Sequence, residues 1–124
     1  MLTPHGPDAN SDAGMNVALL LGPAFSAAEM KGRDLAGTKV ELIAAGVVGG
    51  AGTGADVLGD PINSICYLAN ALGRTGDSLP AGSLITTGAA AVMQPTAYKA
   101  GDTVVAKFDG LGELAVNIAA DAKM

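Results

Sequence analysis

Hydrophobic and polar residues alternate most clearly in the middle of the chain and near its end, and these patterns predict short β-strands. Residues 38–45 pass from lysine to valine, glutamate and leucine, as in a strand with one face in solvent. Residues 103–109 and 113–118 are two further runs joined by a turn at 110–112, which predicts a hairpin. Residues 16–22 are apolar on successive positions, which is typical of a strand buried on both faces.

One amphipathic helix is predicted between these strands. The carboxylate of Asp60 can accept hydrogen bonds from first-turn amides, and Pro61 suits the first helical position. The apolar residues that then recur at spacings of three and four are Ile62, Ile65, Cys66, Ala69 and Leu72. Gly73 or Gly76 can end the helix.

Glycine-rich segments connect the predicted elements. Residues 47–48 can pair back on the strand at 38–45, and residues 49–54 then predict a flexible crossing. Residues 25–34 predict a short turn or helical bend, and residues 82–87 a short strand. Residues 1–14 have no apolar periodicity and predict a flexible lead-in to a domain over residues 15–124.

About six short strands and one helix result, with strands on both sides of the helix. This order favours an α+β, mainly β fold: a mixed, short-stranded β-sandwich or roll with one amphipathic helix. The composition agrees, because 49% of the residues are hydrophobic and only 3% are aromatic, with 18 glycines. Such a core is built from small and aliphatic side chains, with many turns between short strands.

Charge and cysteine content narrow the classes of partner. The net charge is −5 and the seven lysines and arginines are scattered, which argues against nucleic acid as a partner. The most apolar run, residues 17–21, is too short to cross a bilayer, so no membrane partner is expected. Cys66 is the only cysteine, which excludes an internal disulfide and fits a reduced cytoplasm.

Few residues suggest chemistry by themselves. Residues 50–55 satisfy G-x-G-x-x-G/A, but Asp60 and Pro61 place the helix start too late for dinucleotide binding. The twelve carboxylates include no E-x-E or D-x-D pair, so no residue is expected to ligate a metal. Thr86, Thr87 and Gly88 end a predicted strand, where hydroxyls and amides can face a ligand carboxylate or carbonyl.

Six short motifs nevertheless follow one another in a characteristic order. They are Leu58-Gly59-Asp60-Pro61, Leu68-Ala69, Pro80-Ala81-Gly82-Ser83, Thr87-Gly88, Gly101-Asp102 and Gly110-Leu111-Gly112. As a set they resemble the C-terminal half of the fumarylacetoacetate hydrolase superfamily. The resemblance is strongest to its branch of 2-oxo-4-pentenoate (vinylpyruvate) hydratases and 4-oxalocrotonate decarboxylases.

The resemblance implies a metal-dependent lyase of aromatic catabolism, which adds water to 2-hydroxypenta-2,4-dienoate. Such enzymes use Mg or Mn, and their metal carboxylates and catalytic lysine lie in an N-terminal half that has no counterpart here. We therefore expect a truncated or fragmentary hydratase-like lyase that is inactive alone and binds no cofactor alone. A 4-oxalocrotonate decarboxylase-like enzyme and a non-catalytic, β-rich structural or oligomerisation module are the alternatives.

The resemblance also implies site residues and partners. Thr87, Gly88 and Ala89 are expected to contact the substrate, a small 2-oxo or 2-hydroxydienoic acid. Asn10-Ser11 resembles the family's N-A-S segment, which makes Ser11 a tentative catalytic residue. A cytoplasmic protein is expected, and a homo-oligomer is compatible with the family.

Overall fold

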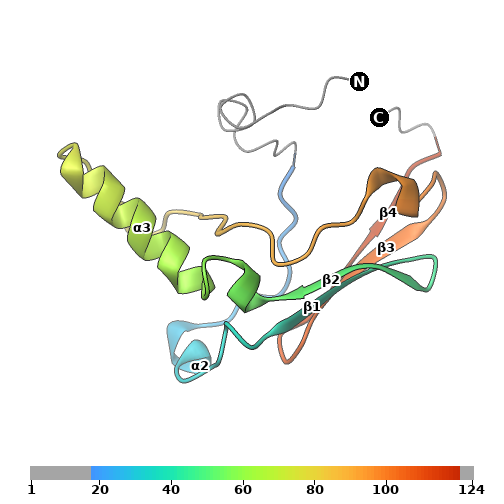
Figure 1. The fold of residues 1–124 in the computed structure, drawn as a ribbon, viewed down its shortest axis with the longest axis horizontal. Helices are drawn as coiled ribbons and strands as arrows, with labels where there is room; N and C mark the ends of the chain where they lie inside the picture. Colours follow the sequence, from blue (N-terminus) through green and yellow to red (C-terminus); the bar gives the residue numbers. More distant parts are fainter. Residues whose placement is uncertain (1–17, 121–124) are drawn as a thin grey trace.

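Four antiparallel strands form a single sheet in the computed structural model, which describes residues 18–120 (Figure 1). The strands are β1 (Lys39–Ala44), β2 (Val47–Thr53), β3 (Thr103–Phe108) and β4 (Gly112–Asn117). Their order in the sheet is β2-β1-β3-β4, so two hairpins from distant parts of the sequence meet at β1 and β3. The expected α+β class is confirmed, and so is the predicted hairpin near the end of the chain.

The strand register separates an apolar inner face of the sheet from a charged outer face. Val40 pairs with Phe108, and two residues further along β1 Leu42 pairs with Ala106, so these four side chains share the inner face. Glu41 lies between them on the outer face. The buried hydrophobic side chains in the described part of the chain are Val40, Ala44 and Val57, which are 5%, 2% and 5% exposed. The core is therefore small and lies against the inner face.

The flexible crossing predicted for residues 49–54 is wrong, because β2 continues through most of this segment as far as Thr53. The glycines of this segment are explained by the backbone of residues 90–92, which covers this part of β2. A Cβ atom on Gly50 would meet the carbonyl oxygen of Val92, and one on Gly52 would meet that of Ala90. These glycines therefore let the segment at 90–92 approach the strand closely.

The predicted helix is present as α3 (Pro61–Arg74), and its N-terminus is capped as expected. The Asp60 carboxylate accepts a hydrogen bond from the backbone N–H of Ile62 at 2.8 Å. No residue of α3 is buried, however, and Ile62 is 47% exposed. Figure 1 shows α3 beside the sheet, and α3 makes no extensive contact with any of the four described strands. No helix within residues 18–120 is long and apolar enough to span a membrane.

Two other predicted strands are not formed. Residues 18–22, the described part of the segment 16–22, and residues 83–87 have no regular secondary structure, and residue 82 lies in a turn. Both segments still contribute to cavities beside the sheet: Leu20 lines one together with Leu114 of β4, and Thr87 lines another together with Val40 of β1. These segments therefore lie near the sheet without pairing at a strand edge. The lead-in predicted for residues 1–14 lies outside the described residues.

Candidate functional site

A mostly apolar cavity of about 350 Å³ lies between the inner face of the sheet, the start of α3 and the segment at 87–91. Its volume is in the range of small-ligand pockets. The residues that line it are Leu35, Thr38, Val40, Leu42, Gly54, Val57, Pro61, Thr87, Gly88, Ala89, Ala90, Ala91, Phe108 and Leu111. Pro61 brings the start of α3 into a lining that also contains Val40 and Leu42 of β1 and Phe108 of β3.

Each wall of this cavity is placed by a different element. β1 supplies Val40 and Leu42 from its inner face, and β3 ends with Phe108 beside them. The 3₁₀ helix η2 (Gly54–Asp56) is followed by Val57, whose amide bonds back to the carbonyl of Gly54 at 3.0 Å. This bond holds the backbone of Val57 at the end of η2, and the Val57 side chain is buried where it lines the cavity.

Thr87, Gly88 and Ala89 all lie on the wall of this cavity. Gly88 has φ +122°, a backbone conformation that residues with a Cβ rarely adopt. A Cβ atom there would also lie 3.3 Å from Cγ1 of Val57. Glycine at this position therefore allows the segment to close on Val57. Contact with a substrate stays a prediction for all three residues, and Ser11 lies outside the described residues.

The lining residues can bind and orient a ligand but cannot transfer a proton. None of them has a titratable side chain, and Thr38 and Thr87 provide the two side-chain hydroxyls. Within residues 18–120 no group of three or more His, Cys, Asp or Glu side chains could hold a metal ion. The divalent metal that the resemblance implies therefore does not fit the described residues.

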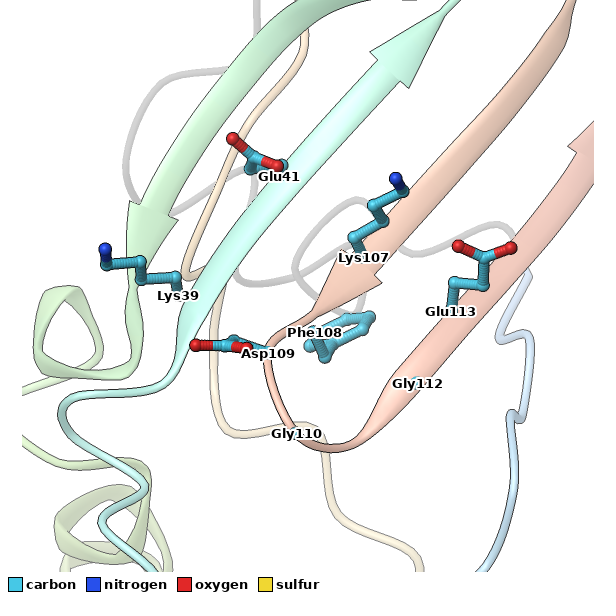
Figure 2. A pocket seen from close by; sticks show the side chains of 8 residues that line it. All are labelled: Lys39, Glu41, Lys107, Phe108, Asp109, Gly110, Gly112 and Glu113. Atoms are coloured by element: carbon cyan, nitrogen blue, oxygen red, sulfur yellow. The ribbon is translucent and has the colours of Figure 1, made fainter.

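A second cavity, of about 490 Å³, lies on the outer face and has a very different lining (Figure 2). Glu41 of β1 pairs in register with Lys107 of β3, which pairs with Glu113 of β4. Figure 2 shows these three side chains on one open face of the sheet, with Lys39 and Asp109 at its end. Exposed opposite charges on neighbouring strands stabilise a sheet by about 0.2–1 kcal/mol per pair. The charged row on the outer face therefore has a structural explanation, and the apolar cavity is the candidate site.

Part of this site was missed at the level of the sequence. The motif Thr87-Gly88 marked one wall, but Val57, Phe108 and Leu111 were not expected to face it. The alternation through Val40 and Leu42 was a usable signal, since it placed both side chains on one face of a strand. Leu111 was a second signal, because an apolar side chain between two turn glycines needs a partner.

Most of this chain, including all the residues that line the apolar cavity, is similar to known proteins. The model of the fumarylacetoacetate (FAA) hydrolase C-terminal family matches residues 6–119. The 4-oxalocrotonate decarboxylase of Pseudomonas putida is 40% identical over 63 residues, which are 51% of this chain and 23% of that enzyme. The 2-keto-4-pentenoate hydratase of Burkholderia vietnamiensis is 40% identical over 81 residues, 65% of this chain and 30% of the relative.

The fold is similar to solved structures of one of these enzymes. The 4-oxalocrotonate decarboxylase from Pseudomonas putida G7, complexed with magnesium and adipate, matches with a TM-score of 0.65 and 33% identity. The match covers 73% of this chain and 34% of the decarboxylase chain. A second structure of that decarboxylase holds calcium and acetate. The chain thus spans about a quarter to a third of the length of the relatives it matches.

Proposed function

Because the chain belongs to the fumarylacetoacetate hydrolase C-terminal family, we propose that it provides the substrate-binding wall of a 2-oxo-4-pentenoate hydratase-type lyase. The observation that carries the proposal is the cavity at 87–91, which joins the Thr87-Gly88 motif to an apolar floor from β1 and β3. A small 2-oxo or 2-hydroxydienoic acid has a hydrocarbon part that suits this floor. Thr87 would then supply a hydroxyl to its polar end.

A 4-oxalocrotonate decarboxylase-type role is the second candidate. It is favoured by the similarity in sequence and in fold to the Pseudomonas putida decarboxylases. Adipate, named with one of those structures, is a six-carbon dicarboxylate, whereas a pentenoate has one carboxylate. The mainly apolar cavity, which has no cationic side chain in its lining, favours the acid with the single carboxylate.

The proposal gives this chain a role in binding and no chemical step. Water addition or loss of CO2 needs groups that move protons, and the cavity lining contains no titratable side chain. Magnesium or manganese in such enzymes would stabilise an enolate-like transition state. Within residues 18–120 no group of three or more His, Cys, Asp or Glu side chains could hold such an ion, which supports our proposal that the chain alone binds no divalent cation.

Ligand titration followed by NMR tests the binding role. We expect 2-hydroxypenta-2,4-dienoate, and more weakly the dicarboxylate adipate, to shift the amide signals of Thr87, Gly88 and Ala89. Gly88→Ala should weaken binding about tenfold or more, because it adds a strained Cβ beside Val57. Gly82→Ala is the matched control, since Gly82 also has a positive φ, of +82°, but has no atom near its Cβ position.

Two outcomes would contradict the binding role. One is the absence of shifts at 87–89 with either acid, which would favour the non-catalytic structural module. The other is equal weakening by the two glycine substitutions. A direct assay tests the absence of chemistry: with Mg or Mn, the purified chain should leave the dienol absorbance at its background rate of decay. Efficient turnover would show that the chain does supply a catalytic centre.

Cellular location and assembly complete the proposal. We propose a cytoplasmic location. It is supported by Cys66, which is exposed and is the single cysteine of this sequence, so that no disulfide forms within it. Homo-oligomer formation is supported by the apolar side chains that α3 leaves exposed. Sedimentation of the purified chain over a hundredfold range of concentration tests it, and a constant monomer mass would exclude it.

A further inference from the structure

Arg33 links two parts of the molecule that are far apart in the sequence. Its guanidinium Nη1 donates a hydrogen bond to the carbonyl oxygen of Gly110, in the turn between β3 and β4. The same guanidinium lies over the ring of Phe25, with its central carbon 5.7 Å from the ring centroid. One side chain therefore connects the segment before β1 to the turn between β3 and β4, which lies at the end of the sheet where β1 begins.

The backbone on both sides of this link is held in place. Arg33 follows α2 (Ala27–Met30), and its N–H donates to the carbonyl of Met30 at 3.1 Å. The helix α2 begins with a capping box, in which the amide of Ser26 donates to the Glu29 carboxylate at 2.7 Å and the Glu29 amide donates to the Ser26 hydroxyl at 3.3 Å. Arg33 thus projects from a braced turn and not from a free loop.

The turn that Arg33 contacts supplies two walls of the apolar cavity. Phe108 precedes this turn and Leu111 is its last residue; both line the cavity, and the N–H of Leu111 donates to the carbonyl of Phe108 at 3.0 Å. Gly110 has φ +70°, and a Cβ atom there would lie 3.0 Å from the Arg33 guanidinium. Arg33 thus bonds to, and closely approaches, the turn whose two ends line the cavity; the Asp109 N–H also ties this turn to the carbonyl of Lys39 at 2.9 Å.

We propose that Arg33 is a positioning residue, which holds the turn at 109–111 so that Phe108 and Leu111 close the apolar cavity around its ligand. The inference rests on the binding role proposed above and adds a residue outside the cavity to it. Arg33 does not line the cavity. Its effect on a ligand passes through the carbonyl of Gly110, and a planar guanidinium is suited to bond that oxygen while stacking on Phe25.

Three variants of the full chain test this role, each compared with the wild type. Arg33→Ala removes the link and Arg33→Lys keeps a charged donor. Arg74→Ala removes an arginine from the last turn of α3 and is the matched control. Amide exchange with solvent is measured by NMR for Leu111 and for Asp109, whose N–H donates to the backbone carbonyl oxygen of Lys39 at 2.9 Å. Adipate affinity is measured from the signals of residues 87–89.

We expect Arg33→Ala to raise amide exchange at Leu111 and Asp109 about tenfold, as for loss of one charge-assisted hydrogen bond, without raising it in α3. Adipate affinity should fall several-fold while the urea midpoint of unfolding stays close to that of Arg74→Ala. Arg33→Lys should recover part of the affinity, and added ethylguanidinium should recover part of it in Arg33→Ala. Such rescue would not follow from a general loss of stability.

The proposal is overturned if Arg33→Ala leaves exchange at Leu111 unchanged, or if it raises exchange equally throughout the sheet and α3. Equal effects of Arg33→Ala and Arg74→Ala would also overturn it. If the wild-type chain binds no adipate and no dienoate, the proposed function fails. The exchange data and their rescue by lysine then decide the role of Arg33 in placing the turn.

Discussion

Single glycines in this chain differ sharply in what surrounds them. Gly52 lies under the backbone of Ala90, whereas Gly73, near the end of α3, has no atom beyond the adjacent backbone of its own helix within 4 Å of the place where a Cβ would stand. The same chemical change should therefore have opposite effects at the two positions. Gly52 serves a close approach of two backbones, and Gly73 only adds freedom to a helix.

Gly52→Ala should lower the free energy of unfolding by about 1–3 kcal/mol, because the added methyl group forces Ala90 away from β2. Gly73→Ala should raise it by about 0.5–1 kcal/mol through helix propensity. Urea unfolding of the two variants, followed by circular dichroism, measures both. Equal destabilisation by the two substitutions would show that the segment at 90–92 does not lie against β2.

Glu29 makes the cap of α2 sensitive to acid. The backbone hydrogen bond from Ser26 holds the pKa of Glu29 below its usual value of 4.5, and the Ser26 hydroxyl and Arg33 lower it further. A lowered pKa means that the cap is fully stabilising above pH 4.5 and is lost as the pH falls through the pKa of the folded state.

An NMR titration of the Glu29 side chain should therefore give a midpoint below 4.5. Ser26→Ala should move the midpoint upward, because the hydroxyl that donates to Glu29 at 2.7 Å is removed. A midpoint at or above 4.5 in the wild type would contradict the capping box.

At the scale of elements, α3 depends unusually strongly on its own cap. A helix of 14 residues with no buried residue receives little stabilisation from tertiary packing. Asp60 satisfies the amide of Ile62, so Asp60→Ala should cost about 1 kcal/mol of helix stability. Asp60→Asn keeps an accepting oxygen and is the control. Helical circular dichroism during thermal unfolding measures the difference, and indistinguishable curves for the two variants would refute this role of Asp60.

Elements with local signals were predictable from the sequence, and those that depend on distant contacts were not. The cap and proline at Asp60 and Pro61 marked the start of α3 to the residue, whereas its end at Arg74 falls between the two predicted glycines. The glycine turn at 110–112 marked the hairpin of β3 and β4. The extent of β2 could not be predicted from the neighbouring sequence, because its glycines are explained by close contact with the backbone of Val92 and Ala90, about forty residues away. Thr87 and Gly88 were found through the family motif, whereas Leu111 faces the cavity only because the turn folds over β1.

At the scale of the whole molecule, the sheet and α3 are only weakly connected. The described strands contact one another extensively, but none of them contacts α3 in this way. We therefore expect amide hydrogen exchange to be slowest in β1 and β3, at the centre of the sheet, and faster throughout α3. Exchange mass spectrometry of the full chain measures the two regions together. Equal protection of α3 and β1 would indicate that the helix and the sheet unfold as one unit.

The pairing of β1 with β3 also has a consequence for the order in which the molecule folds. Each hairpin can form from neighbouring residues, but their junction must close a long loop that carries α3 and residues 87–91. Loop closure costs entropy before the distant contacts repay it, so this junction should form last and limit the folding rate. The cavity is assembled at this junction. Its walls therefore come together in the slowest step, and a chain arrested before that step would have both hairpins but no binding site.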